Sequence, residues 1–301
     1  MFKYRIFVYT AFIATLFSLK VNAQVSFQFN QYMYNQYVIN PAYAGSNEAL
    51  EITSSFRKQW FGVEGSPFSQ VISAHTPLRN KNVGLGMLVA NDKIGIHNNF
   101  QISTSYAYKI KIDRRKSISV GLQGGVYQSM SDYTEISQSF SSFSDPAFNE
   151  NLPQNINPTF GTGIFYYTKD FYAGVSVLNM EAQNIFENAQ TFITAGKTFM
   201  LTNNVVLQPG VLVNYSPDKE ITADIFSNLV LNDVLWLGVS YRTFNSINML
   251  TQLQITPQIR FGYSYGAPTG GLGKISTGTH EIMLQYRFSF YRARVVTPRY
   301  F

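Results

Sequence analysis

Apolar and polar residues alternate with a period of two over several long stretches of the chain. Between residues 100 and 112, one face carries Phe100, Ile102, Tyr106, Tyr108, Ile110 and Ile112, and the other carries Gln101, Ser103, Ser105, Lys109 and Lys111. Near the C-terminus, Ile282, Leu284, Tyr286, Phe288 and Phe290 oppose Glu281, Gln285, Arg287 and Ser289. Strands with one lipid-facing side and one lumen-facing side have this pattern. The alternation therefore predicts an all-β fold, a transmembrane antiparallel β-barrel.

Segments of this kind number about fourteen, and the connections between them alternate in length. They lie near 50–57, 69–77, 83–91, 98–112, 116–128, 159–168, 171–179, 190–201, 204–216, 220–231, 234–243, 247–256, 258–266 and 279–291. The even-numbered segments are followed by short turns: RNKN, DRRK, KD, TNN, ND and a turn around Pro257. Longer or richer loops follow the first, third, fifth, seventh and thirteenth segments, and they include 131–157 and APTGGLGKISTG.

This alternation in length predicts the orientation of the barrel. Outer-membrane barrels have short periplasmic turns and longer extracellular loops. We therefore assign the even-numbered turns to the periplasm. Since no Pro- or Ser-rich linker divides the chain, residues 47–301 are expected to form one closed barrel, which leaves no sheet edge in lipid.

The N-terminus has the pattern of a secretory signal peptide. Lys3 and Arg5 precede an apolar stretch from Ile6 to Leu19, and small residues lead to Ala23. We expect residues 1–23 to be removed by cleavage after Ala23. The apolar stretch is short for a bilayer-spanning helix, and no later segment offers the roughly 20 apolar residues that such a helix needs. The sequence thus predicts an exported chain without a transmembrane helix.

Residues 24–46 differ from the alternating segments because amides alternate with Tyr and Phe and then give way to NPAYAG. Asn-Pro starts a turn and restricts Asn40 to an extended conformation, and Gly45 permits a positive φ. Two hypotheses fit this segment. It is either an ordered leader that packs on the periplasmic mouth, or a plug or partner-binding segment of the barrel.

Composition supports the membrane assignment and excludes other classes. Aromatic residues make up 16% of the chain and charged residues only 13%, whereas soluble domains usually carry about a quarter charged residues. A soluble β-sandwich or solenoid would expose apolar faces such as 282–290 to water, where they would aggregate. The basic clusters, 114–116 and those near the C-terminus, lack the density of a nucleic-acid-binding surface. We therefore expect no nucleic-acid partner.

The sequence shows no motif for catalysis, cofactors or metals. There is no cysteine, and the three histidines, His75, His97 and His280, are far apart in different predicted strands or loops. GGLGK lacks the spacing of a phosphate-binding loop, and no Gly-x-Ser-x-Gly elbow occurs. The chain is accordingly expected not to be an enzyme and to hold no cofactor.

Several motifs together resemble a known family. The run QYMYNQYVINPAYAGS is followed by SFRKQWFGVEGSPFSQVISAHTPL and VGLGMLVANDKIG. This combination is similar to the PorP/SprF family of type IX secretion and gliding-motility proteins of Bacteroidetes. The resemblance implies an outer-membrane location, a role in export or surface anchoring of a large secreted protein such as a gliding adhesin, and other secretion components as partners. A passive or substrate-specific transport channel is the alternative function.

Candidate partner-binding residues lie in the N-terminal segment and in the first outward loop: Tyr34, Asn35, Asn40, Pro41, Tyr43, Gly45, Trp60, Gly62 and Pro67. Trp60 is either an interfacial residue at the level of the lipid headgroups or an anchor for a partner. The lumen-side charges Lys109, Lys111, Asp224, Arg260 and Arg287 either line a channel or form ion pairs that fill the interior.

Overall fold

The computed structural model describes residues 29–47, 49–79, 81–113, 115–131, 156–181, 188–217, 221–243, 245–269 and 276–288. The predicted signal peptide, residues 1–23, and residues 24–28 of the N-terminal segment lie outside this described part. Almost all of the predicted barrel strands lie within it.

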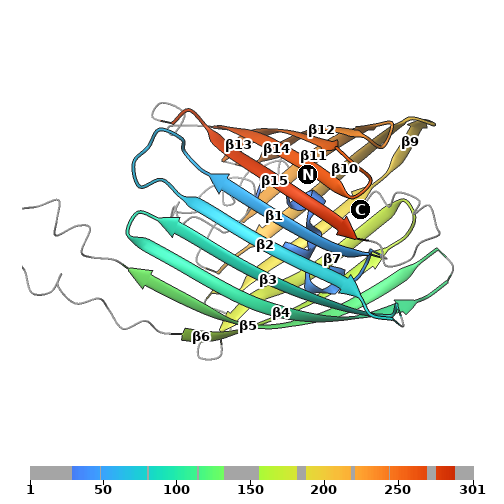
Figure 1. The fold of residues 1–301 in the computed structure, drawn as a ribbon, viewed down its shortest axis with the longest axis horizontal. Coiled ribbons are helices and arrows are strands. Elements are labelled where there is room, and N and C mark those ends of the chain that lie inside the picture. Colours follow the sequence, from blue (N-terminus) through green and yellow to red (C-terminus); the bar gives the residue numbers. More distant parts are fainter. Residues whose placement is uncertain are drawn as a thin grey trace, which may run out of the picture.

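In the part of the chain that the structure describes, fifteen strands and three short 3-10 helices follow one another (Figure 1). The helices are η1 (Tyr32–Tyr34), η2 (Gln36–Val38) and η3 (Pro41–Tyr43). The strands are β1 (Leu50–Lys58), β2 (Phe68–Pro77), β3 (Val83–Ile94), β4 (His97–Lys111), β5 (Ser117–Ser131), β6 (Ile156–Tyr167), β7 (Phe171–Glu181), β8 (Gln190–Lys197), β9 (Phe199–Thr202), β10 (Val205–Tyr215), β11 (Thr222–Leu231), β12 (Leu235–Arg242), β13 (Ser246–Gln254), β14 (Ile259–Pro268) and β15 (Thr279–Phe288).

The strands form one closed antiparallel barrel. Neighbours in the sequence pair with each other, and β1 pairs with β15 to close the sheet. The predicted eighth segment, 190–201, is interrupted at Thr198, so β8 and β9 both pair with β10 and occupy one position in the barrel. The structure therefore confirms a barrel of fourteen strand positions, in which every strand except β9 pairs with neighbours on both sides.

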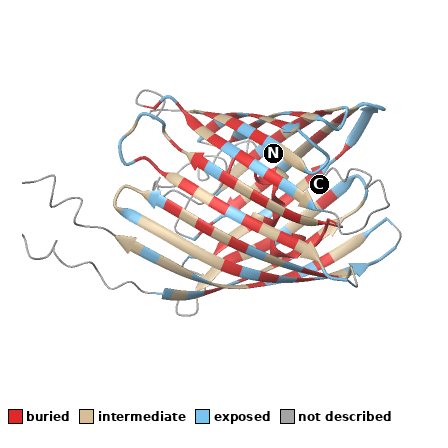
Figure 2. Ribbon diagram, in the orientation of Figure 1, coloured by how far each residue is buried: buried red, intermediate tan, exposed pale blue. Residues whose placement is uncertain are grey.

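Side chains alternate between lumen and exterior along most of the strands, as Figure 2 shows by the alternating burial colours. In β15, Ile282 is 46% exposed on the outer face, whereas its neighbour Glu281 is fully buried in the lumen. Leu284, Tyr286 and Phe288 also face outward. The lipid-facing and lumen-facing assignments made from the sequence are thus confirmed for this strand.

The connections define two ends of the barrel. At the turn end, the strands are joined by 78–82, 112–116, 168–170, 203–204, 232–234 and 255–258, which match the predicted short turns. The opposite, loop end carries 59–67 and 269–278 among others. The third connection was predicted to be longer, and this prediction was wrong. β3 and β4 are joined by Gly95 and Ile96 alone, because Gly95 adopts a φ of +55° that suits a tight hairpin turn.

Residues 29–47 lie inside the barrel, and we call them the luminal segment. The three 3-10 helices belong to it, and Figure 1 shows them in blue, enclosed by the strands. No helix among the described residues has the length and apolar character needed to span a bilayer. The luminal segment fills space that the strands enclose, and it forms the candidate functional site together with the wall around it.

Candidate functional site

The luminal segment is folded by local hydrogen bonds around Asn40 and Pro41. Asn40 is extended, and its Oδ1 accepts a hydrogen bond of 2.9 Å from the amide of Ala42. Pro41 follows at the first position of η3, where its fixed φ suits a helical turn and its missing N–H is not needed. The turn at Asn40-Pro41 and the extended conformation of Asn40 were expected from the sequence, and the side-chain cap stabilises that turn.

Glycines of the wall receive the backbone of the luminal segment. A Cβ atom added to Gly84 would overlap the carbonyl group of Ala44, and one added to Gly121 would overlap Pro41 and Ala42. On Gly163 it would overlap the side-chain oxygen of Asn40. All three glycines face the lumen, so the strands supply a surface without side chains where the segment comes closest.

Asn40 also bonds directly to the wall. Its Nδ2 donates to the carbonyl oxygen of Ile164 at 3.0 Å, in β6. The same nitrogen lies 3.4 Å from the carbonyl oxygen of Val175 in β7. One buried amide thus caps η3 and joins it to two strands.

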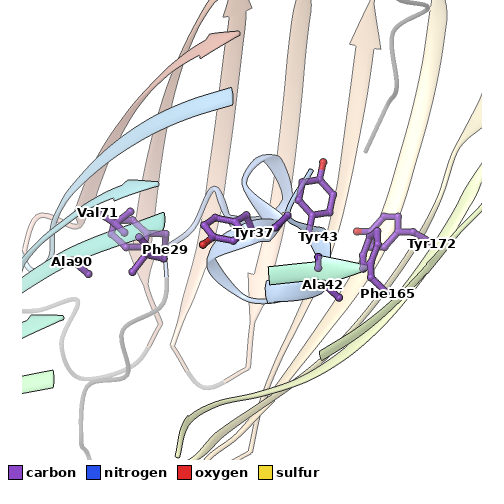
Figure 3. Close-up of a cluster of buried hydrophobic side chains, with 11 residues drawn as sticks. Phe29, Tyr37, Ala42, Tyr43, Val71, Ala90, Phe165 and Tyr172 are labelled. Carbon is purple, nitrogen blue, oxygen red and sulfur yellow. The ribbon is translucent and has the colours of Figure 1, made fainter. Parts of the chain in front are cut away.

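Aromatic side chains pack the body of the segment against the wall (Figure 3). The ring of Tyr43 contacts those of Phe165 and His75 edge-on, with centroid distances of 5.3 and 5.5 Å. The hydroxyl of Tyr37 bonds to Ser105 Oγ at 3.0 Å. Such pairs bury large apolar area and satisfy the polar end of the ring.

The N-terminal end of the segment is held at the loop end of the barrel by charged groups. The carboxylate of Glu281 accepts hydrogen bonds from the amides of Asn30 and Gln31 at 2.7 and 3.0 Å. Arg242 donates to the carbonyl oxygen of Phe29 at 3.3 Å. Arg57 Nε lies 4.0 Å from the same Glu281 carboxylate. Hydrogen bonds to ionised groups are stronger than those between neutral groups.

Most of the buried charges of the lumen are paired with an opposite charge. Asp224 and Arg242 form a two-contact pair, with Nε to Oδ1 and Nη2 to Oδ2 distances of 2.9 Å each. At the turn end, Arg287 Nη2 lies 2.8 Å from Glu51 Oε2, and Asn47 of the luminal segment donates to the same oxygen. Two of the lumen charges predicted from the sequence, Asp224 and Arg287, therefore form ion pairs. Their partners, Arg242 and Glu51, also contact the luminal segment.

A different contact holds Tyr34. Its hydroxyl donates to Asn228 Oδ1 at 2.9 Å, and its ring packs against a cluster of Val206, Val230 and Trp236. Arg260 lies over the Trp236 ring, 4.2 Å from its centroid. This cation–π contact gives Arg260 a neutral partner on the turn-end side of the lumen.

The structure separates the predicted partner-binding residues into two groups. Those of the luminal segment, Tyr34, Asn35, Asn40, Pro41, Tyr43 and Gly45, contact the wall and are buried or half-buried. Asn35, for example, donates to Ser73 Oγ at 2.9 Å. Partner binding by these residues stays a prediction, and their observed contacts are with their own barrel.

The loop residues of that set lie elsewhere. Trp60 and Gly62 are half-buried and exposed in the connection 59–67, while Pro67 is buried at its end. The amide of Phe61 bonds to the carbonyl oxygen of Gly278, which ties this connection to the one before β15. The two groups do not form one site.

Sequence reasoning missed the wall residues that receive the segment. Glu281 and Arg242 were not singled out as its partners, and the glycines of the wall were not recognised as its cradle. A signal was present in the lumen-facing glycines of the predicted strands, such as Gly84, Gly121 and Gly163. A glycine within a strand often marks the close approach of another backbone.

The polar groups of the lumen hold the luminal segment. Over the described ranges, no three His, Cys, Asp or Glu residues are grouped in a way that could hold a metal ion. The buried carboxylates accept hydrogen bonds from backbone N–H groups, from the side-chain amide of Asn47 and from guanidinium groups. The lumen is thus built around contacts between protein segments.

A family comparison identifies the chain. The model of the type IX secretion system membrane protein PorP/SprF matches residues 21–286. The chain belongs to the PorP/SprF family. The match begins before the luminal segment and extends into β15, so it includes the wall and the residues enclosed by it. The family and the closed barrel place this PorP/SprF protein in the outer membrane.

Solved structures share the barrel fold at low sequence identity. The Acinetobacter baumannii outer membrane protein Omp33 is 10% identical with a TM-score of 0.50, and the match covers 80% of this chain and 98% of that one. The monoaromatic hydrocarbon channel CymD is 13% identical with a TM-score of 0.52, covering 90% and 96%. A mutant of the monoaromatic hydrocarbon channel TodX is 8% identical with a TM-score of 0.53, covering 88% and 95%. A search of curated proteins finds no match.

Proposed function

We propose that this PorP/SprF barrel assists the export or surface anchoring of a large secreted protein, and that its luminal segment keeps the barrel closed to solutes. The role is non-enzymatic. The observation that carries the proposal is the luminal segment itself, whose contacts reach from Glu281 near the loop end to Gly84 near the turn end.

The contacts of the segment support closure. Its N-terminal end bonds to β12 and β15, its centre to β4, β6 and β7, and its C-terminal end approaches β2 and β3. A solute would therefore have to displace hydrogen-bonded residues around most of the barrel wall. A barrel closed in this way is better suited to binding a polypeptide than to passive diffusion.

The transport alternative draws support from the two aromatic-hydrocarbon channels among the similar structures, and that likeness concerns the fold alone. A channel of this kind needs a continuous path for its substrate. The backbone-to-backbone approach at Gly84 and Gly121 leaves no room for one between the luminal segment and the wall at β3 and β5. We therefore favour the assembly role.

The test is purification of the tagged protein from its own outer membrane in mild detergent, with mass spectrometry of the proteins that accompany it. The proposal predicts a large secreted protein or other type IX secretion components in stoichiometric amounts. It also predicts that liposomes containing the purified barrel retain small sugars. A barrel that purifies alone and releases those sugars would instead establish transport.

A further inference from the structure

The outward face of the barrel carries few charged side chains. In the strands that the structure describes, the outward positions hold three lysines, Lys58, Lys93 and Lys197, and no carboxylate. A lysine is costly at the middle of a bilayer and tolerated near its interfaces. Lys58 ends β1 and Lys93 is next to the last residue of β3, so both lie at the loop end, whereas Lys197 ends β8 at the turn end. These lysines therefore lie where lipid headgroups are expected.

The two loop-end lysines belong to one row that crosses four neighbouring strands. His280 of β15 pairs with Lys58, Lys58 pairs with Phe68 of β2, and Phe68 pairs with Lys93. Figure 1 shows β15, β1, β2 and β3 side by side. Neighbouring strands are about 4.8 Å apart, so the backbones at Lys58 and Lys93 are about 10 Å apart. Their long side chains can thus reach one anion from two sides, with His280 next to it.

Aromatic residues hold the ring of His280. The hydroxyl of Tyr263 and Nδ1 of His280 are 2.8 Å apart. The ring of Phe61 meets the imidazole edge-on at a centroid distance of 5.3 Å, and the ring of Tyr265 lies 5.4 Å away. With the tyrosine hydroxyl as donor, the imidazole proton lies on Nε2, which is then a hydrogen-bond donor.

The connections at the loop end fix these aromatic residues in place. The amide of Phe61 donates to the carbonyl oxygen of Gly278 at 2.8 Å, and the amide of Thr277 donates to that of Phe61 at 3.1 Å. The hydroxyl of Tyr265 donates to the carbonyl oxygen of Thr277 at 2.7 Å. Two connections and two strands therefore position the rings beside His280, and a ligand would find them already ordered.

The ammonium group of Lys58 is also positioned by a connection. Its Nζ donates to the carbonyl oxygen of Ser66 at 2.8 Å. An ammonium group has three donors, and this bond uses one of them. The bond holds the positive charge at the rim of the barrel without neutralising it.

We propose that His280, Lys58 and Lys93, which we call the cationic row, bind the phosphate group of an anionic lipid. The barrel lies in the outer membrane, so lipid is what covers its outward face. The row has the charge that complements a phosphate, and basic groups near a membrane surface attract anionic lipids. Phe61 is 54% exposed beside the row and offers an apolar surface at the level of the headgroups. This inference is independent of the proposed role in secretion.

The experiment uses the full-length protein purified from its own outer membrane in detergent. Native mass spectrometry measures binding of dioleoyl phosphatidylglycerol, which is anionic, and of dioleoyl phosphatidylcholine, which has the same chains and no net charge. We expect tighter binding of phosphatidylglycerol by about tenfold or more. Inorganic phosphate is expected not to displace the lipid, because it lacks the apolar contacts.

Three variants locate the site. The double substitution Lys58→Gln and Lys93→Gln is expected to weaken phosphatidylglycerol binding by about tenfold or more and to leave phosphatidylcholine binding unchanged. Lys58→Arg with Lys93→Arg keeps the charges and should retain binding within about twofold. Lys197→Gln, which removes the outward lysine of the turn end, is the matched control and should have no effect. Equal β-sheet content in all variants shows that the barrel is folded.

Each opposite result overturns the proposal in its own way. Equal binding of the two lipids by the unmodified protein would show that the row does not select anionic lipid. Unchanged phosphatidylglycerol binding in the double glutamine variant would place the lipid elsewhere. A loss in Lys197→Gln as large as that in the double variant would mean that any outward lysine attracts the lipid. Displacement by inorganic phosphate would make the row a site for a free anion.

Discussion

The two parts of the luminal segment are held by different kinds of contact. At the N-terminal end, Asn30 and Gln31 depend on the carboxylate of Glu281. The body of the segment instead fits a wall whose glycines leave room for Pro41, Ala42 and Ala44. A charge contact can be removed without changing the space available, whereas the glycine contacts can be broken only by filling that space. We therefore expect that substitutions can release the two parts separately.

The largest expected effect is at the charged end. Glu281→Ala removes the acceptor for two backbone amides and leaves Arg57 without that carboxylate, a loss of about 3–5 kcal/mol for a broken buried pair. We expect hydrogen exchange at Asn30 and Gln31 to speed up at least about 100-fold, with little change at Tyr43. Glu64→Ala, in the exposed loop 59–67, is the control. Equal exchange across the whole segment would show that its two parts are not separable.

Filling the wall is expected to act on the body of the segment. Gly121→Leu places a side chain where Pro41 and Ala42 lie, at a cost of about 1–3 kcal/mol for overpacking. The segment should then become cleavable by added protease between Tyr37 and Gly45. Gly124→Leu is the matched control on the same strand, because a Cβ there meets nothing within 4 Å. If the segment in the Gly121→Leu variant remained protected from the protease, the strands of the wall would have moved to make room for the leucine, and the prediction would be wrong.

A smaller effect is expected at the cap. Asn40→Ala removes the side-chain acceptor of Ala42 and the bond to Ile164. Loss of such a cap costs about 1–2 kcal/mol. We expect faster exchange at Ala42 and Tyr43, with the barrel melting temperature unchanged. Asn40→Asp keeps the capping oxygen and should restore protection at Ala42 only, which would separate the cap from the wall contact.

The smallest effect is expected from the Tyr37 hydroxyl. Tyr37→Phe removes one hydrogen bond to Ser105 and keeps the ring in its packing position. The expected loss is about 1 kcal/mol, measured as exchange at Tyr37 and Val38. An effect as large as that of Gly121→Leu would show that polar contacts, rather than shape, hold the body of the segment.

The sequence was sufficient for the strands and their facing, because period-two alternation is local. In β15 it placed Ile282 outside and Glu281 inside. It did not show the break at Thr198, since Phe199–Thr202 continues an acceptable strand pattern and the break arises from the neighbouring turn at Asp170. The tight turn at Gly95 was likewise hidden by polar residues that also suit a loop.

The candidate site was only partly accessible to sequence reasoning. The Asn40–Pro41 turn and the positive φ of Gly45 were predictable from those residues alone, and the structure has both. The position of the segment inside the lumen depends on contacts with residues up to 251 positions away, such as Asn30 with Glu281. Contacts between residues so far apart in the sequence leave no local pattern. Lumen-facing glycines in predicted strands, however, indicate where a segment can lie against the wall.

Closure of the barrel by the luminal segment can be measured as single-channel conductance in planar bilayers. The purified full-length protein is compared with a variant that keeps the signal peptide and lacks Gln24–Gly45, after both are shown to have the same β-sheet content. If the segment closes the barrel, we expect no conductance steps for the full-length protein and steady open steps for the deletion variant. Open steps of equal size from both proteins would contradict it.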